Sequence, residues 1–194
     1  MTARPDRSPE ILLDEAALDE RTADLAAAIT ADHPDGVIFV GVLKGALVFL
    51  ADLARRVQDI DVSVDFLAIS RYAPDSGRVR LLKDLDLDVT DRDVVIIEDL
   101  VDTGLTLAYL VQHITARGAR RVEICALLDR SERRIVPLPL RYVGATIPGD
   151  AFVLGYGLHV GEQYRNLPFV VRGDPAVLVA NPDAYLSLYG RGVG

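Results

Sequence analysis

The sequence has few of the residues that build disulfide-linked or membrane-spanning proteins. Its 194 residues include one cysteine, Cys125, which cannot form a disulfide within the chain. Cys125 stands in an apolar run (124–128), which favours a buried core side chain over a nucleophile. No apolar run approaches the roughly 18 residues of a membrane helix, and residues 1–10 contain no apolar stretch of signal-peptide type. We therefore expect a cytoplasmic protein with no membrane partner.

Aromatic and basic residues are also scarce. Tryptophan is absent and aromatics make up 6% of the chain, so aliphatic side chains must fill the core. Lys and Arg total 21 against 29 Asp and Glu, a formal net charge of -8. Because nucleic-acid backbones attract Lys and Arg, this balance argues against a nucleic-acid partner. A phosphate would have to be held locally, by backbone amides and a few cations.

Apolar runs alternate with segments of helical spacing along the chain. Helices are expected from Asp14 to the stop at residues 33–36, over about 47–57, and from about residue 105 to Gly118. Strands are expected at 37–43, 62–69, 79–82, 94–97, 121–128, 142–147 and 152–156. This alternation predicts an α/β fold with a mostly parallel twisted sheet and helices on both faces. Ligands of such sheets bind beyond the carboxyl ends of the strands, here after Leu43, Ile97, Leu128 and Tyr156. The apolar tail (185–189) would pack on the body or on a partner.

Residues 98–106, Glu-Asp-Leu-Val-Asp-Thr-Gly-Leu-Thr, place carboxylates at a strand end and hydroxyls at a helix start. The unpaired N–H groups of a first helical turn form an anion site, and Gly104 lets a phosphate approach the backbone. Glu98 and Asp99 would repel phosphate but suit ribose hydroxyls or a hydrated cation. A single carboxylate here would more simply be a solvated loop residue or a helix cap. The whole string instead predicts a site for a phosphorylated ribose.

The same string resembles the phosphoribosyl pyrophosphate signature of type I phosphoribosyltransferases. The remainder is similar to hypoxanthine-guanine phosphoribosyltransferases from about Ile11 to Val171, in matched blocks at 40–46, 70–72, 81–85 and 155–158. The resemblance implies a type I phosphoribosyltransferase fold in a single domain, 1–194. Its small hood lobe would come from about 11–36 and 150–194. It also implies a homodimer or homotetramer.

Residue roles follow from the resemblance alone. Asp102 would be the catalytic proton acceptor near N7 of the purine. The residues implied to bind phosphoribosyl pyrophosphate are Leu43, Lys44, Gly45, Glu98, Asp99, Asp102, Thr103, Gly104, Leu105, Thr106 and Arg165. Those implied to bind the base are Arg130, Phe152, Val153 and His159. Ser70, Arg71 and Tyr72 would belong to a flexible loop that closes over the reaction. Mg²⁺ would be the cofactor, with Glu98 and Asp99 nearby, directly or through ribose or water.

Two positions depart from the family pattern at the base-binding end. Arg130 stands where the family usually has a lysine that donates to the purine 6-oxo group, and arginine is a larger, planar donor. His159 stands where an aspartate usually helps to hold a second magnesium near the purine C2 group. Neutral imidazole is a poor ligand for that hard cation.

The expected activity is transfer of the phosphoribosyl group to hypoxanthine or guanine, with release of pyrophosphate, in purine salvage. Two alternatives stay open. One is a phosphoribosyltransferase for a modified or deaza-purine, which the departures at Arg130 and His159 would suit. The other is a regulator that senses phosphoribosyl pyrophosphate without turnover, although the acidic chain shows no recognition helix for nucleic acid.

Overall fold

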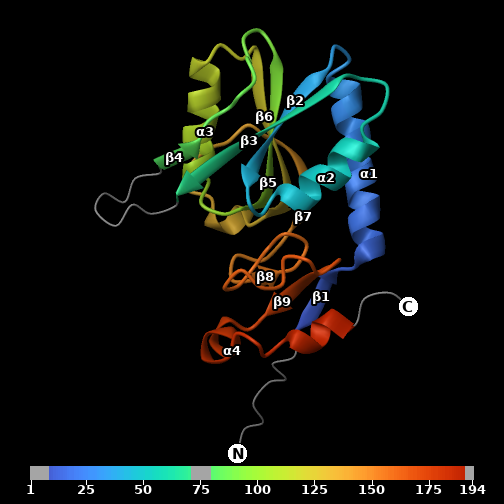
Figure 1. Ribbon diagram of the computed structural model, residues 1–194, viewed down its shortest axis with the longest axis vertical. Helices are drawn as coiled ribbons and strands as arrows, with labels where there is room; N and C mark the ends of the chain where they lie inside the picture. The colour runs from blue at the N-terminus through green and yellow to red at the C-terminus, as the bar shows by residue number, and fades with distance from the viewer. Residues whose placement is uncertain (1–8, 71–79, 191–194) are drawn as a thin grey trace, which may run out of the picture. The chain divides into compact units, whose positions relative to one another are not determined.

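The computed structural model describes residues 9–70 and 80–190, which form two compact units (Figure 1). The larger unit spans Arg21–Gly149. The smaller unit combines the described parts of Met1–Glu20 and Asp150–Gly194. Arg71 and Tyr72 of the expected flexible loop lie outside the described residues.

The larger unit is built on a six-stranded sheet in the order β4-β3-β2-β5-β6-β7. All neighbours pair in parallel except β3 and β4, which are antiparallel. The strands are β2 (Val37–Leu43), β3 (Val62–Ser70), β4 (Arg80–Lys83), β5 (Asp93–Val101), β6 (Arg121–Asp129) and β7 (Leu140–Thr146). The prediction of a mostly parallel α/β sheet is confirmed.

Helices cover both faces of this sheet (Figure 1). α3 (Leu105–Ala116) lies on one face, and α2 (Leu47–Arg56) with much of α1 (Glu15–Asp32) lies on the other. Because β2, β5 and β6 are sandwiched between these layers, their side chains are almost all buried, Cys125 included. This explains the apolar runs at 37–43, 94–97 and 124–128.

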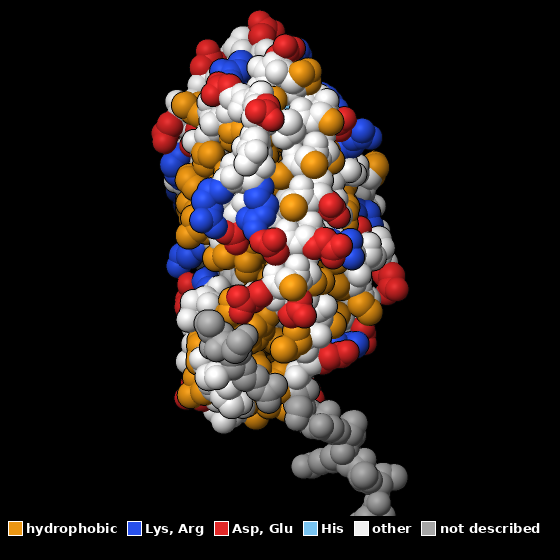
Figure 2. All heavy atoms as spheres, turned by 90° about the vertical axis from the view of Figure 1, so that its right-hand side faces the viewer, with side chains coloured by type: hydrophobic (Ala, Val, Ile, Leu, Met, Phe, Trp, Pro, Cys, Tyr) orange, Lys and Arg blue, Asp and Glu red, His pale blue; other side chains and the backbone are white. Residues whose placement is uncertain are grey.

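The first helix begins and ends where its sequence predicts. The Asp14 carboxylate accepts a hydrogen bond from Ala17 N at 2.8 Å, which caps the first turn of α1. Gly36, with a φ of 93°, follows the last turn. Acidic and basic side chains are interspersed over the face that carries α1 (Figure 2). No described helix is both long and apolar enough to cross a membrane.

β5 is longer than the sequence predicts. We expected it to end at Ile97, where the apolar run stops, but the strand continues to Val101. Its pairing with β2 does end at Ile97, whereas β6 continues beside it and pairs Leu100 with Leu128 and Val101 with Asp129. Glu98 and Asp99 therefore lie within a strand and not in the turn that follows it. Backbone pairing with β6 extends the strand, and the pattern of apolar residues carries no information on such pairing.

The smaller unit contains a separate antiparallel sheet in the order β1-β9-β8. Its strands are β1 (Glu10–Leu13), β9 (Val170–Gly173) and β8 (Phe152–Leu154), followed by α4 (Pro175–Ala180) and the 3-10 helix η2 (Leu186–Gly190). The expectation that residues 152–156 extend the parallel sheet was wrong, so the rule for carboxyl ends does not apply after Tyr156.

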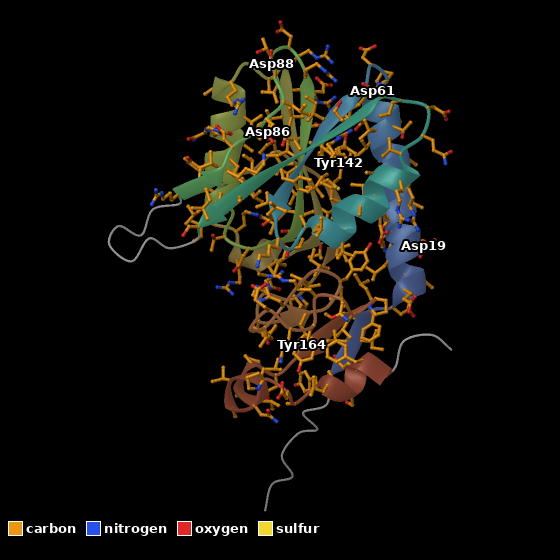
Figure 3. All side chains as sticks on the ribbon, viewed as in Figure 1. Asp19, Asp61, Asp86, Asp88, Tyr142 and Tyr164 are labelled. Atoms are coloured by element: carbon orange, nitrogen blue, oxygen red, sulfur yellow. The ribbon has the colours of Figure 1, made fainter. Side chains whose placement is uncertain are left out.

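The apolar tail packs on the core of the smaller unit. Tyr185 and Leu188 are buried there among Leu154, Tyr164 and Leu167. Tyr164 lies inside this unit, and its ring stacks on that of Tyr189 with centroids 5.6 Å apart (Figure 3). Two of the apolar tail residues, Tyr185 and Leu188, thus pack within the chain itself, whereas Leu186 and Tyr189 remain exposed.

A buried polar network joins the amino ends of β5, β6 and β7 to the end of α1. His33, which is 1% exposed, lies with Nδ1 2.9 Å from an Asp93 carboxylate oxygen and Nε2 3.2 Å from the Tyr142 hydroxyl. Arg120 donates to the other Asp93 oxygen at 2.7 Å. Burial alone would raise the pKa of Asp93, but hydrogen bonds from Arg120 and His33 outweigh it and lower that pKa. Tyr142 lies inside the larger unit (Figure 3).

We predict that Asp93→Asn lowers the free energy of unfolding at pH 7 by between about 1 and 3 kcal/mol, because Arg120 and His33 lose a charged acceptor. A lowered pKa in the folded state gives stability that is present above the unfolded pKa of about 4 and lost as the pH falls through the folded value. Urea unfolding should therefore show a difference from wild type at pH 7 that shrinks by about pH 3. Asp24→Asn, on the exposed face of α1, is the control. A difference independent of pH would contradict this account.

Candidate active site

The turn from β5 to α3 creates an open helix start. Gly104 is buried and holds a φ of 86°, a left-handed conformation that glycine adopts without steric cost. It is the N-cap of α3, and no side chain caps this helix end in the described structure. The first backbone N–H groups of a helix have no partner within the helix, and the helix dipole adds positive potential there. Thr103, Leu105 and Thr106 flank this anion-binding geometry.

A second segment packs beside this turn. Residues 130–135, here called the arginine turn, follow β6 and include the 3-10 helix η1 (Ser131–Arg133). Arg130 N donates to Val101 O at 2.9 Å, and Ile135 N donates to Thr103 O at 2.9 Å. These two hydrogen bonds fix the arginine turn to both ends of the Val101–Thr103 segment, and Asp102 lies between them.

The Asp102 carboxylate faces two arginines of that turn. Arg133 Nε lies 3.0 Å from Asp102 Oδ1, and Arg130 Nη1 lies 3.7 Å from Oδ2. Oδ1 is nevertheless buried and accepts no hydrogen bond of good geometry from the described residues. A buried acceptor in this state is a common sign of a functional group, since a ligand N–H can complete it.

The two arginines differ in their surroundings. The Arg130 side chain is 11% exposed, and burial lowers its pKa, partly offset by the nearby Asp102. The Arg133 side chain is 50% exposed. Next to it, Arg134 pairs with the carboxylate of Asp129. The sequence pointed to Arg130 and did not single out Arg133, Arg134 or Asp129. Three arginines within five residues were the available signal.

Glu98 and Asp99 are both buried, at 5% and 8% exposure. As neighbours in a strand they project to opposite faces of the sheet. Asp99 packs against the turn after β2, because a Cβ built on Gly45 would lie 1.7 Å from Asp99 Oδ2. In this turn the peptide bond between Leu43 and Lys44 is cis, and Lys44 is exposed. The structure thus brings Gly45 and Asp99 together.

Within the described residues, no group of three or more His, Cys, Asp or Glu side chains could hold a metal ion by itself. Magnesium is usually bound by one or two carboxylates together with substrate phosphates and water. Because Glu98 and Asp99 project to opposite faces of the sheet, either carboxylate alone would fit a magnesium ion that is carried mainly by the substrate. They do not form a protein-only metal cage.

Four of the expected site residues lie in the smaller unit, namely Phe152, Val153, His159 and Arg165. Phe152 is partly buried against its core, and Val153 is buried in β8, an edge strand whose outer side is not used in that sheet. Arg165 donates to Gly157 O at 2.6 Å and to Glu162 Oε1 at 3.1 Å. Ser70 ends β3 in the larger unit, where it pairs with Arg80.

His159 does not suit a metal in this arrangement. Its Nδ1 accepts a hydrogen bond from Glu162 N at 3.1 Å. In the neutral ring the proton is then on Nε2, so no ring nitrogen keeps an available lone pair. A second magnesium at position 159 does not fit the residues present.

A parallel sheet with an open helix start at its carboxyl edge is an arrangement by which α/β proteins bind phosphorylated ligands. The family model described as phosphoribosyl transferase domain matches residues 10–162. The chain belongs to this phosphoribosyltransferase family.

Named relatives are similar over nearly the whole chain. The hypoxanthine-guanine phosphoribosyltransferase of Bacillus subtilis is 41% identical over 172 residues, covering 87% of this chain and 94% of the relative. The hypoxanthine phosphoribosyltransferase of Escherichia coli is 38% identical, covering 83% and 93%. The solved structure of a hypoxanthine-guanine phosphoribosyltransferase from Bacillus anthracis superposes with a TM-score of 0.81 at 40% identity, covering 85% and 98%. The expected type I phosphoribosyltransferase fold is confirmed.

We predict that Gly45→Ala destabilises the protein by between about 1 and 3 kcal/mol, because the new methyl group overlaps the buried Asp99 carboxylate. Gly190→Ala is the matched control, since a Cβ there meets nothing within 4 Å. Its effect on the free energy of unfolding should stay within about 0.5 kcal/mol. Equal effects of the two substitutions in urea unfolding would show that Asp99 does not pack against Gly45.

Proposed function

We propose that the protein transfers the 5-phosphoribosyl group of phosphoribosyl pyrophosphate to a 6-oxopurine, hypoxanthine or guanine. The products are the nucleoside monophosphate and pyrophosphate, and the pathway is purine salvage. The observation that carries the proposal is the turn from β5 to α3, where an open helix start adjoins the carboxylates of one strand. The names of the relatives agree with it.

The ribose phosphate would be divided between the two parts of this turn. The backbone N–H groups and hydroxyls of Thr103, Gly104, Leu105 and Thr106 would hold the 5′-phosphate. Glu98 and Asp99 would accept hydrogen bonds from the ribose hydroxyls. This role suits a carboxylate, whereas binding of the phosphate does not require one. This arrangement would allow a chain of net charge -8 to bind a polyanion.

Leaving pyrophosphate would be held by the turn after β2 and by cations. Leu43, Lys44 and Gly45 would supply backbone and ammonium donors, and Arg165 would add a guanidinium group. Magnesium, when bound, would neutralise charge on the pyrophosphate, with Glu98 and Asp99 as the nearby carboxylates. Ser70, Arg71 and Tyr72 would belong to a loop that closes over the reaction and excludes water.

Asp102 would accept the proton that the base loses from N7 as it attacks the ribose. Its Oδ1 is the buried acceptor that takes no hydrogen bond from the described residues, beside a guanidinium that keeps the carboxylate oriented. Arg130, Phe152, Val153 and His159 would contact the base, Phe152 by stacking and Val153 through its backbone.

Two further features belong to the proposal. Phosphoribosyl pyrophosphate carries several charges and does not cross a bilayer unaided, which supports a cytoplasmic location. Assembly into a homodimer or homotetramer follows from the family alone, and light scattering coupled to size exclusion would test it against the monomer mass of 21.1 kDa.

A second candidate is the same transfer to a modified or deaza-purine. Arg130 and His159 would favour it, because the resemblance assigns both departures to the base-binding end, whereas the string 98–106 keeps the family pattern. Ordinary kinetics with hypoxanthine and guanine would exclude it. A regulator without turnover is the third option, and a gel-shift assay with RNA or DNA beside a pyrophosphate-release assay separates it from an enzyme.

The direct test incubates the protein with magnesium, phosphoribosyl pyrophosphate and a mixture of bases, and then identifies the nucleotide formed. Inosine or guanosine monophosphate is the expected product. Release of pyrophosphate with another nucleotide would support the second candidate. No nucleotide and no pyrophosphate would overturn the proposal.

We predict that Asp102→Asn lowers kcat by about 10²- to 10⁴-fold, because the amide cannot accept the proton of the base. The dissociation constant for magnesium phosphoribosyl pyrophosphate, measured by calorimetry, should change by no more than about threefold. Normal turnover by this variant would show that Asp102 is not the proton acceptor.

A further inference from the structure

A 6-oxopurine presents a donor and an acceptor on one edge. N7 and O6 lie side by side there, so a base protonated at N7 offers N–H next to a carbonyl oxygen. The complementary protein surface is an acceptor beside a donor. Asp102 is such an acceptor, which leaves the identity of the neighbouring donor to be decided between Arg130 and Arg133.

Arg133 has the geometry of that donor. Its Nε lies 3.0 Å from Asp102 Oδ1, the oxygen that still lacks a hydrogen bond of good geometry. A guanidinium carries five N–H donors in one rigid plane, so Arg133 has further N–H groups to offer to a ligand besides the one that faces Asp102. At 50% exposure, the side chain can be reached by a ligand from solvent.

The surroundings of Arg130 suit a residue that positions Asp102. Its side chain is 11% exposed and its Nη1 lies 3.7 Å from Asp102 Oδ2, too far for a hydrogen bond. Its backbone N–H is used in the hydrogen bond to Val101 O. A largely buried, charged side chain close to the carboxylate helps to hold Asp102 in position and is less accessible to a ligand than Arg133 is.

The backbone on both sides of Arg133 is held in place. Arg133 N donates to Arg130 O at 2.9 Å, and Glu132 Oε2 accepts from Gly149 N at 2.9 Å. On the other side, Arg134 pairs with Asp129, and its guanidinium packs against Gly104. Arg133 is therefore an exposed arginine on an anchored turn, which is the condition for a specific contact.

We propose that Arg133, and not Arg130, donates to the 6-oxo group of the base and so selects 6-oxopurines. This inference rests on the proposed function and adds the specificity-determining residue to it. Arg130 is a positioning residue that acts through Asp102. The expected family donor at position 130 has thus been replaced in its role by a residue three positions further along the same turn.

The test is a competition between hypoxanthine and purine, which lacks the 6-oxo group, for limiting phosphoribosyl pyrophosphate, with both nucleotides quantified. Arg133→Ala should lower kcat/KM for hypoxanthine by about 10- to 100-fold, the range for a hydrogen bond to a charged group. The preference for hypoxanthine over purine should fall by the same factor, and the KM for phosphoribosyl pyrophosphate should stay within about twofold. Arg133→Lys should recover part of the preference.

Two variants complete the comparison. Arg130→Ala should lower turnover of both bases alike and keep the preference, whereas Arg55→Ala, at an exposed arginine that pairs with Asp52 on α2, should change neither. Unchanged preference in Arg133→Ala, or loss of preference in Arg130→Ala, overturns this inference while normal wild-type turnover leaves the proposed function intact. A wild-type protein that makes no nucleotide from either base overturns both.

Discussion

The structure of the site depends on the attachment of one turn to another. Two backbone hydrogen bonds, from Arg130 to Val101 and from Ile135 to Thr103, join the segment after β6 to the segment that leads from β5 into α3. They exist because β5 and β6 pair in parallel up to Val101 and Asp129, beyond the last residue of β5 that pairs with β2. Without this attachment Asp102 would be a solvated loop carboxylate. With it, Asp102 has a fixed position beside arginines and next to an open helix end.

The charges of the molecule are arranged locally and not globally. An acidic chain gains no general attraction for phosphates, so recognition must come from oriented N–H groups and from a few cations. The arginine turn provides the cations where a carboxylate already stands, which keeps Asp102 compatible with a partly buried site. At the other end of the same strands, His33, Asp93 and Arg120 form a second polar network with a different task, since it ties α1 to the sheet.

Much of this could be predicted from the sequence, because apolar runs and helix signals report directly on burial. The bounds of β2 match its apolar run, and Asp14 caps α1 as its position suggests. The end of β5 was missed because pairing with β6 carries two acidic residues within the strand. The strand pattern alone did not separate residues 152–154 from the parallel sheet, because three residues carry no signal of strand direction, although the family resemblance assigned them to a separate lobe. Arg133 was missed because it lies near Asp102 only through the path of the chain after β6, and the type of a side chain does not reveal that path.

The proposed function requires the open start of α3 to bind the phosphate of a ribose. Amide resonances recorded during titration with ribose 5-phosphate test it most directly, because each N–H reports its own environment. We expect saturable shifts at Gly104, Leu105 and Thr106, with little change at Gly118 beyond the far end of the same helix. Shifts confined to other parts of the chain, or none at millimolar ligand, would contradict it.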